Sequence, residues 1–561
     1  MKDFILIYIP LFSLTKKHQL SLFFRFFMAH PTIAYPTEHK KNKPQTSDHQ
    51  TSDNDFGVNF ATLREKVLER RPVLREIIEK RGHKDLFTYA QDYLDVNLNE
   101  TILARQPEFL AAFSSEVEKR LGKEVAKSAT EQLRKYYFVS TADHHGPICH
   151  PFFLNSNLVT AMTCLEQSDP ILQNVIVLAC ANVSQNNSSF PRGLLFQTNG
   201  KENPELNRLP ILPAHSRLSP VFKFRSYLKS EIEKLAKLLR RKAQNKEIPQ
   251  TVSQKVTAVL EEIYQADEVL ALQSYSDQIT LTNFRLWKKF FGEHEKIKPN
   301  LIYLEEEAVV SRLLVDHHLA GNTPISKILF GEKESEMLVK HFDGVEGGFD
   351  LGRKQGTYLF WALPEGEKYR IPLWREGGEL VSEDGTFRVK LEPQAIKQGL
   401  ESKILIPSML LSYLLLSFYY GLKCLGGFCQ VNYLTAMKDA YLKLLVDLGE
   451  ADEAKALEKV QTKELGEDLT IAFLEHGERK IALATGLDLV IYGKPDAWKI
   501  LKNQARNITI AEALDPMMPE FYRVMYGTKE RDEQLMAITA EQILKHTGLS
   551  QKIEACAILR D

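Results

Sequence analysis

The spacing of hydrophobic residues changes along the chain and predicts a mixed α/β protein. Apolar residues recur at helical spacing through residues 60–80 and again through residues 99–135. The short apolar runs 136–141 and 174–180 are typical of buried strands, and a helix is expected between them over residues 151–165. A strand, loop, helix and strand in this order indicate a parallel sheet, and ligands bind such sheets at the carboxyl ends of the strands.

Later segments alternate between helical and strand patterns. A charged helical hairpin is expected from residue 219, with its turn at Glu247–Gln250, and the run 300–304 predicts another buried strand that leads into a helix. Short strand-like runs between Pro-Glu-Gly and Glu-Asp-Gly turns predict a small antiparallel insertion after residue 344. The C-terminal region is expected to be mainly helical and to end on an amphipathic segment near 540–546.

We therefore divide the chain into a tail and seven structured segments. In order, these are a tail (1–54), a helical layer (55–135), the first part of the sheet core (136–218), a helical hairpin insertion (219–290), the second part of the core (291–343), an antiparallel β insertion (344–392), core helices with a Gly-Gly motif (393–448) and a mainly helical region (449–561).

Residues 1–54 are expected to lie outside the fold. The apolar run 4–14 is similar to the hydrophobic part of a signal peptide, but charged residues follow it in place of a small-residue cleavage site. Residues 36–53 are rich in Lys, Thr, Ser, Asp and His, which is typical of disorder. The segment is therefore predicted to be a disordered tail, or the result of a start codon placed upstream of Met28.

One internal stretch has the length of a membrane span. Ile404–Leu422 carries no charge and just reaches the roughly 20 residues that a spanning helix needs. Pro407 and several serines and tyrosines within it, however, are equally suited to a buried helix, and a single span here would divide an otherwise soluble chain. We expect a buried core helix.

Composition and charge narrow the function classes. The chain has 561 residues, with 72 Lys and Arg against 73 Asp and Glu, for a formal net charge of -1. This balance disfavours a dedicated nucleic-acid binder. Six cysteines without a CxxC pair disfavour a disulfide framework and a zinc ribbon, and are typical of a reducing, cytoplasmic location. We expect a small-molecule partner, no membrane, and a chain that could also form a homo-oligomer.

The densest group of chemically versatile side chains follows the strand 136–141. Imidazoles at a strand-to-helix junction can stabilise a phosphate together with the helix N-terminus, and Gly146 would let the backbone approach it. The same side chains are competent zinc or iron ligands, and histidines there could also simply cap the helix or bond the backbone. These three alternatives stay open for the group Asp143, His144, His145 and His150.

Two other groups could contribute to a binding site. The amides after the strand 174–180, including Asn186, suit a polar small molecule, and Arg192 suits a carboxylate or phosphate. Gly426 and Gly427 permit close backbone approach, and a helix after them would aim its amide donors at a ligand. A surface loop in the first case and a plain turn in the second are the alternatives. The further candidate binding residues are Asn155, Gln430 and Tyr433.

The Asp316–His318 run is similar to an Asp-His-His phosphoesterase motif, but its position favours a structural role. Apolar residues before it place it at the end of an amphipathic helix, where histidines complement the helix dipole and its unpaired carbonyls.

Two regions resemble, in the same order, the cysteine-adding enzyme family of bacillithiol biosynthesis. That family has a strand, a Gly-Gln-Gln-Pro-Gly-Leu-type loop and a Gly-Pro entering a helix; here Val139–Pro151 takes this place, with His144 and His145 at the paired glutamines. It later has an apolar helix leading to Tyr-Val-Gly-Gly-Pro-x-Glu-x-x-Tyr, and here Ile404–Leu422 leads to Cys424–Tyr433. The resemblance covers residues 130–200 and 390–445.

The resemblance implies a Rossmann-like core of the nucleotidyltransferase type with helical additions. Together with the residue pattern, it predicts an α/β fold with a Rossmann-like parallel-sheet core, helical N- and C-terminal additions, a helical hairpin and a small antiparallel β insertion. The loop at His144, His145 and Gly146 is also similar to the phosphate-binding loop of that superfamily, in which histidines stabilise the transferring phosphate. One departure stands out: the family's strand ends in Glu-Asp-His-Asp, whereas Asn182–Asn187 contains no acid.

The sequence thus predicts a small-molecule ligase or transferase that binds a nucleotide, such as ATP, or a phosphorylated metabolite. His144 and His145 would stabilise developing phosphate charge, Arg192 would orient an anionic group, and the Gly-Gly motif would close the site. The alternatives are a metal-dependent hydrolase or oxygenase that uses the Asp143–His150 group, and a non-catalytic protein with an enzyme-like fold, which the missing acids keep open.

Overall fold

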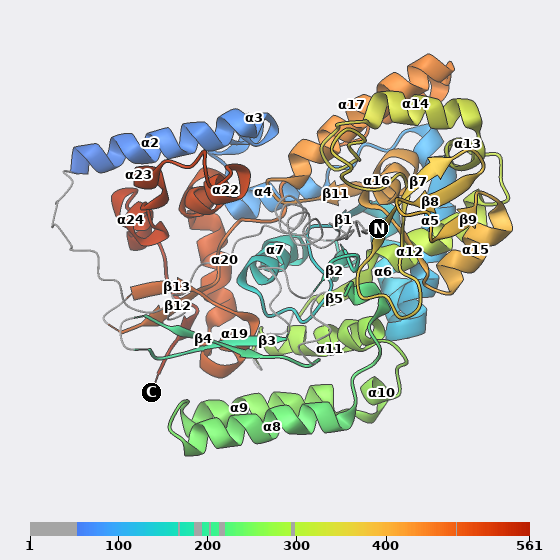
Figure 1. Cartoon of the computed structure of the whole chain (residues 1–561). Helices are drawn as coiled ribbons and strands as arrows, with labels where there is room; N and C mark the ends of the chain where they lie inside the picture. Colours follow the sequence, from blue (N-terminus) through green and yellow to red (C-terminus); the bar gives the residue numbers. More distant parts are fainter. Residues whose placement is uncertain are drawn as a thin grey trace, which may run out of the picture.

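The computed structural model in Figure 1 describes residues 53–165, 169–184, 193–200, 203–212, 219–292, 298–477 and 480–560. The predicted tail up to residue 52 lies outside the described residues, and so do Asn186 and Arg192.

The core is a parallel sheet of four strands in the order β11-β1-β2-β5. Its strands are β1 (Phe138–Ser140), β2 (Asn174–Ala179), β5 (Asn300–Glu305) and β11 (Lys423–Leu425). The chain adds β2 and then β5 on one side of β1 and returns much later to place β11 on the other side. The order therefore reverses between β1 and β11, and the mixed α/β class with a parallel sheet is confirmed.

Both faces of this sheet are buried, which explains the continuous apolar runs of its strands. In β2, Val175 and Val177 belong to one hydrophobic cluster, whereas Ile176 and Leu178 belong to the other. Helices α7 (Pro151–Ala161) and α11 (Tyr275–Lys289) contribute to the first cluster. Helices α5 (Glu100–Leu121), α6 (Lys123–Lys135) and α12 (Glu306–Leu313) contribute to the second. The result is a layer of helices on each side of the sheet.

The antiparallel insertion is larger than predicted. It contains β6 (Phe360–Ala362), β7 (Ile371–Glu376), β8 (Glu379–Ser382) and β9 (Arg388–Lys390), and β10 (Leu405–Pro407) joins it in the order β10-β6-β7-β8-β9. The expectation of one buried helix over 404–422 is therefore corrected: β10 is followed by α16 (Met409–Tyr413) and the π-helical turn η7 (Leu414–Tyr419). Pro407, which lacks an N–H, ends the strand segment before the helix begins. The stretch is nonetheless buried, as predicted.

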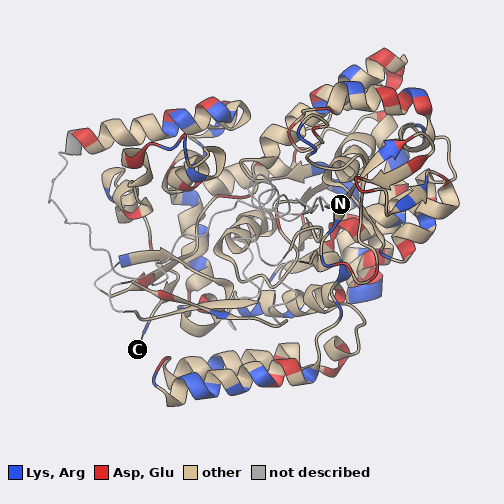
Figure 2. Cartoon of the chain, viewed as in Figure 1, with Lys and Arg blue, Asp and Glu red and all other residues tan. Residues whose placement is uncertain are grey.

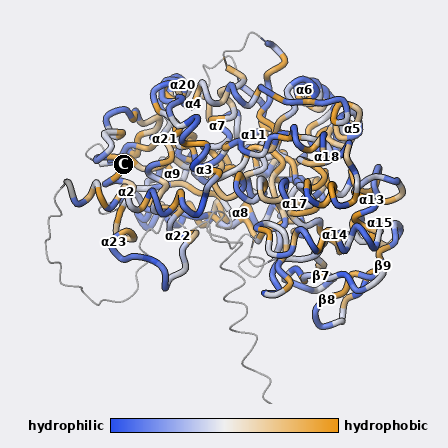
Figure 3. Tube along the Cα trace, turned by 90° about the horizontal axis from the view of Figure 1, so that it is seen from above, coloured by the Kyte–Doolittle hydropathy of each residue, from blue (hydrophilic) through white to orange (hydrophobic). Residues whose placement is uncertain are grey.

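None of the helices in the described part of the chain is both long and apolar enough to cross a lipid bilayer. Acidic and basic residues are interspersed over the outer helices in Figure 2, in keeping with the balanced charge of the chain. Figure 3 shows hydrophilic and hydrophobic residues alternating along the helices.

The remaining elements follow the predicted pattern in part. The hairpin α8 (Lys229–Gln244) and α9 (Gln250–Val259), seen at the lower edge of Figure 1, is confirmed. The helical stretch 60–80 is divided at Pro72, where α3 begins. The C-terminal region is not purely helical, because β12 (Phe473–His476) pairs with β13 (Lys480–Leu483) and with β14 (Ala557–Ile558). A hairpin of β3 (Leu194–Thr198) and β4 (Glu205–Leu209) was also not predicted.

The other helices of four or more residues are α2 (Asp53–Arg70), α3 (Pro72–Arg81), α4 (Leu86–Gln91), α10 (Asp267–Leu270), α13 (Pro324–Phe330), α14 (Glu332–Phe342), α15 (Pro393–Glu401), α17 (Gln430–Leu448), α18 (Ala451–Glu458), α19 (Gly486–Tyr492), α20 (Ala497–Asn507), α21 (Ile510–Leu514), α22 (Met518–Met525), α23 (Glu533–Met536) and α24 (Ala540–His546), with π-helical turns η5 (Leu260–Tyr264) and η6 (Leu314–His318). The short 3-10 turns are η1 (Asp92–Leu94), η2 (Met162–Cys164), η4 (Val221–Lys223), η8 (Asp515–Met517) and η9 (Leu549–Gln551).

Candidate functional site

The two sequence regions that carry the family resemblance meet at the carboxyl edge of the sheet. Strand β1 pairs in parallel with β11, and the backbone N–H of Thr141 donates to the carbonyl of Leu425 at 2.9 Å. The side-chain amide of Gln430, at the start of α17, donates to the Thr141 hydroxyl at 2.5 Å. This is the point where the strand order reverses, and in open α/β sheets such a point forms the crevice that receives ligands.

A third segment, the acidic loop Glu464–Asp468, lies against this edge. Leu465 forms a parallel bridge with Gly426, and the N–H of Gly466 donates to the Gly426 carbonyl at 2.8 Å. A Cβ placed on Gly427 would lie only 2.4 Å from Oε2 of Glu467, so any other residue there would displace this carboxyl group. The loop therefore brings two carboxyl groups, those of Glu467 and Asp468, to the end of β11.

The acidic loop fills the space that the sequence assigned to a phosphate. The N–H of Gly426 donates to the Glu464 carbonyl at 3.0 Å, and the N–H of Phe428 donates to Oδ2 of Asp468 at 2.9 Å. The chain itself therefore uses the N–H groups of Gly426 and Phe428, which favours the plain-turn alternative for this motif. A ligand-binding role of Gly426 and Gly427 stays a prediction.

Three buried carboxyl groups, which we call the edge acids, meet where β1 and β11 end: Asp143, Glu467 and Asp468. Burial raises the pKa of Asp143 to about 7, and the hydrogen bond from Asn157 at 2.9 Å opposes this only in part. Burial and the neighbouring acids raise the pKa of Glu467 well above its usual range, and burial also raises that of Asp468. One oxygen each of Glu467 and Asp468 is buried without a hydrogen-bond partner.

Asp468 also has an unusual backbone conformation. Its φ is +69°, in the left-handed region that few residues other than glycine adopt. Such a conformation costs roughly 1–3 kcal/mol and persists only where surrounding contacts impose it, often at a functional site.

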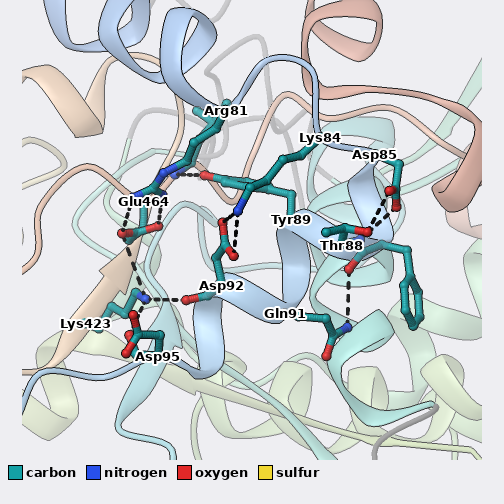
Figure 4. Close-up of polar contacts among 12 residues, drawn as sticks. Arg81, Lys84, Asp85, Thr88, Tyr89, Gln91, Asp92, Asp95, Lys423 and Glu464 are labelled. Carbon is teal, nitrogen blue, oxygen red and sulfur yellow. Dashed lines mark hydrogen bonds and ion pairs between the residues drawn. The ribbon is translucent and has the colours of Figure 1, made fainter.

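A network of charged and polar groups holds the acidic loop in place (Figure 4). Arg81, at the end of α3, donates to Glu464 at 2.6 and 3.4 Å, and the buried ammonium of Lys423 lies 3.9 Å from the same carboxylate. Lys423 also donates to the carbonyls of Asp92 and Asp95 at 2.7 and 2.8 Å. The hydroxyls of Tyr89 and Tyr93 then bind the N–H and the carbonyl of Leu465 at 3.0 and 2.7 Å.

A second pair of acids follows β5. The two oxygens of Glu307 accept from the N–H groups of Ala181 and Asn182 at 2.9 and 2.8 Å, so this side chain connects the start of α12 to the segment after β2. Burial raises the pKa of both Glu306 and Glu307, and the proximity of Glu307 adds to the shift of Glu306. The ring of Tyr433 lies 5.9 Å from that of Tyr413. Burial raises the pKa of both tyrosines, and the nearby Glu306 adds to the rise.

The histidines do not form one group. His145 is completely buried, its ring lies 5.3 Å from that of Tyr303 at an angle of 59°, and its Nε2 is 3.3 Å from the Ser276 hydroxyl. Burial lowers its pKa to about 3, so it is neutral at pH 7 and would not supply the positive charge expected of it. His150 caps α7 by accepting from the N–H of Phe152 at 3.3 Å, which is one of the structural alternatives. His144 is half-buried beside Phe153.

The other predicted residues have mixed positions. Asn155 accepts from the N–H groups of Ile471 and Ala472, both at 2.7 Å, and therefore connects α7 to the segment behind the acidic loop. The carbonyl of Gly146 accepts from Asn283 at 2.8 Å, and the structural interpretation of His318 agrees with its buried contacts to Thr323 and Tyr420. Within the described residues, no three His, Cys, Asp or Glu side chains converge as metal ligands, so the Asp143–His150 group is not brought together as one metal site.

Comparisons with protein-family models and with curated proteins found no match. The edge acids of the acidic loop were missed from the sequence because nothing local marks them. The only signal is that Gly466-Glu467-Asp468 lies between two leucines, Leu465 and Leu469, both of which are fully buried.

Proposed function

We propose that the protein is a small-molecule ligase or transferase with a Rossmann-like core, whose active site is the sheet edge between β1 and β11. The observation that carries this proposal is the meeting of the edge acids, Asp143, Glu467 and Asp468, at the reversal of strand order. Buried acids with raised pKa values in such a position are typical of catalytic acids and bases.

The strand order supports the Rossmann-like part of the proposal. Numbered along the chain, the parallel strands β5, β2, β1 and β11 have the order 3-2-1-4, which occurs in sheets of that type. The resemblance to the cysteine-adding family points to the same core. The acids that the family has after its second strand are absent from Asn182–Asn187, but the acidic loop brings acids to the same edge from a distant part of the chain.

Ligation and transfer both need a proton acceptor. An amine or hydroxyl that attacks an activated carboxyl or phosphoryl group forms the new bond with its lone pair and gives up its proton, while the leaving group takes the electrons of the broken bond. A carboxylate with a pKa near 7 is well matched to accept that proton at neutral pH, and a neighbouring protonated carboxyl can donate one to the leaving group. We assign the first role to Asp143 and the second to Glu467.

This proposal moves the proton chemistry from the histidines to the carboxyl groups. His144 is half-buried, whereas His145 is completely buried and neutral at pH 7. Nucleotide binding stays part of the proposal as an expectation from the sequence, with ATP as the nucleotide to test.

The test uses the full chain with ATP, isotope-labelled cysteine and a deproteinised metabolite extract, and follows labelled conjugates by mass spectrometry. We expect the wild type to form a conjugate, and Asp143→Asn and Glu467→Gln each to slow its formation by roughly 100-fold or more, the usual contribution of a general acid or base. The rate should rise as the pH passes about 7, where Asp143 ionises.

Asp515→Asn is the matched control, because Asp515 is also a mostly buried acid with a pKa raised by burial but lies in η8, beside Arg64. It should leave the rate unchanged. Absence of any conjugate with the wild type, or equal rates in the wild type and the two edge variants, would contradict the proposal.

A further inference from the structure

Arg370, in the antiparallel insertion, reaches across to the carboxyl edge of the sheet. It directly precedes β7, and its guanidinium donates to the side-chain oxygen of Asn182 at 2.8 Å and to the carbonyl of the same residue. The guanidinium carbon lies 4.1 Å from the centre of the Trp361 ring. Asn182 follows β2, so these contacts place a permanent positive charge beside the ends of β2 and β5.

This charge has no compensating carboxylate among the described residues. The hydrogen bonds of Arg370 go to neutral oxygens of Asn182. Glu307 is the acid that influences it, but the Glu307 oxygens are directed to the N–H groups of Ala181 and Asn182. Burial lowers the pKa of Arg370 to about 10, because it costs free energy to remove the charged guanidinium from water.

Arg370 is half-buried, and two other arginines that are withdrawn from solvent, one fully and one in part, differ from it in this respect. Arg120 pairs with Glu116 and Asp277, and Arg81 pairs with Glu464. The segment that follows Asn182 cannot supply the missing partner, because residues 185–192 (QNNSSFPR) contain no Asp or Glu. A buried charge without a partner is costly, so it is maintained most readily where a ligand completes it.

We propose that Arg370 binds an oxyanion of the substrate, a carboxylate or a phosphate group, at the ends of β2 and β5. Arginine presents several N–H donors in a planar fork that matches either anion with two parallel hydrogen bonds. Only one terminal nitrogen contacts Asn182, so donors remain for a ligand. The inference rests on the proposed function, because the oxyanion belongs to the molecule that reacts at the edge acids.

The position fits one polar substrate that spans the edge. Neighbouring strands lie about 4.8 Å apart, so the end of β2 is one strand spacing from the loop that carries Asp143. The exposed turn 365–369 precedes Arg370, so solvent reaches this side of the insertion. The sequence assigned an anion-binding role to Arg192; the structure offers Arg370 from a different segment for the same chemistry.

The test measures binding of two simple probes, inorganic phosphate and acetate, to the full chain by calorimetry and by thermal shift. We expect at least one probe to bind the wild type. Arg370→Gln should lower the affinity for that probe by roughly 10- to 100-fold, which is the usual effect of losing hydrogen bonds to a charged group. The preferred probe distinguishes a phosphate from a carboxylate substrate. Arg375→Gln is the matched control, because Arg375 in β7 also donates to carbonyl oxygens, those of Leu329, Phe330 and Gly377.

If neither probe binds, or if Arg370→Gln and Arg375→Gln weaken binding equally, the inference is wrong. If circular dichroism shows that Arg370→Gln does not fold, the same binding measurement is made with Arg370→Lys, which keeps the positive charge but loses the planar guanidinium. We expect weaker binding of the probe; binding equal to that of the wild type would overturn the inference. These readouts need no turnover. Failure of conjugate formation would therefore refute the proposed function while leaving anion binding at Arg370 to be judged by itself.

Discussion

Gly427 shows how one missing side chain shapes the proposed site. The edge acids can approach β11 because nothing projects from this residue, and Oε2 of Glu467 occupies the place that a Cβ would need. Burial of an acid without hydrogen-bond partners costs free energy, so the fold retains Glu467 at a cost. Such a cost is understandable if the group has a chemical role.

We expect Gly427→Ala to displace the Glu467 carboxyl group. The new methyl would lie 2.4 Å from Oε2 of Glu467 and 3.1 Å from Oδ2 of Asp468, which is too close for both to stay. Overpacking of this kind typically lowers the free energy of unfolding by about 1–3 kcal/mol, and conjugate formation should fall with it. Urea denaturation and the conjugate assay measure the two effects. Gly378→Ala, where a Cβ meets nothing within 4 Å, should change neither; equal behaviour of the two variants would contradict the steric argument.

At the scale of elements, the acidic loop depends on contacts that are remote in sequence. Arg81 and Glu464 are separated by 383 residues, yet their ion pair fixes the start of the loop. Glu464 is only 3% exposed and shares its charge between Arg81 and Lys423 (Figure 4). The loop is therefore held by α3 and α4 as much as by β11.

Arg81→Met should release this loop. Removing one partner of a buried ion pair leaves the other charge buried, which costs about 3–5 kcal/mol; because Arg81 is 30% exposed, we expect the lower end of that range. Hydrogen exchange should become faster at the N–H of Gly466, which donates to Gly426 in the intact loop.

Lys80→Met is the control, because it breaks an exposed pair with Glu76. It should lower the free energy of unfolding by less than about 1 kcal/mol and leave the exchange at Gly466 unchanged. Adding Glu464→Gln to Arg81→Met should restore part of the stability; a further loss would argue against a buried charge as the cause.

The same dependence on remote contacts sets the limit of prediction from the sequence. Strands β1, β2 and β5 were predictable because both of their faces are buried and their apolar runs are continuous. β14 was not, because it has two residues and pairs with β12 across a long separation. Residue type drew attention to the β1 loop and the Gly-Gly motif, and their roles in binding stay predictions. The edge acids Glu467 and Asp468 could not be predicted, because their burial results from the bridge between Leu465 and Gly426.

At the scale of the whole molecule, buried acids and buried histidines make stability depend on pH in opposite ways. Burial raises the pKa of Asp143 to about 7 and that of Glu520 to about 8. Each acid stabilises the fold fully below its unfolded pKa, near 4, and this contribution is lost as the pH rises through the folded value. Burial lowers the pKa of His145 and His318 to about 3, so their contribution is present above about 6.5 and is lost as the pH falls toward 3.

We expect the free energy of unfolding to fall as the pH rises from 5 to 8. The acids whose pKa is raised, which include two neighbouring pairs at the sheet edge, outnumber the histidines whose pKa is lowered, His145, His318 and His476. Urea denaturation at several pH values measures this slope. Between pH 5 and 7, Glu520 is protonated in the folded state and ionised in the unfolded state, so the folded protein binds one more proton because of it. Glu520→Gln removes this difference. The slope of the free energy of unfolding against pH should therefore become shallower by about 1.4 kcal/mol per pH unit, the value of one proton. Asp384→Asn is the control: hydrogen bonds, first from Ser382, lower the pKa of Asp384 to about 2, so it is ionised throughout this range and its removal should leave the slope unchanged. A stability that rises between pH 5 and 8 would mean that these acids ionise in the folded protein, and the edge acids would then lack the raised pKa values on which the proposed proton transfer depends.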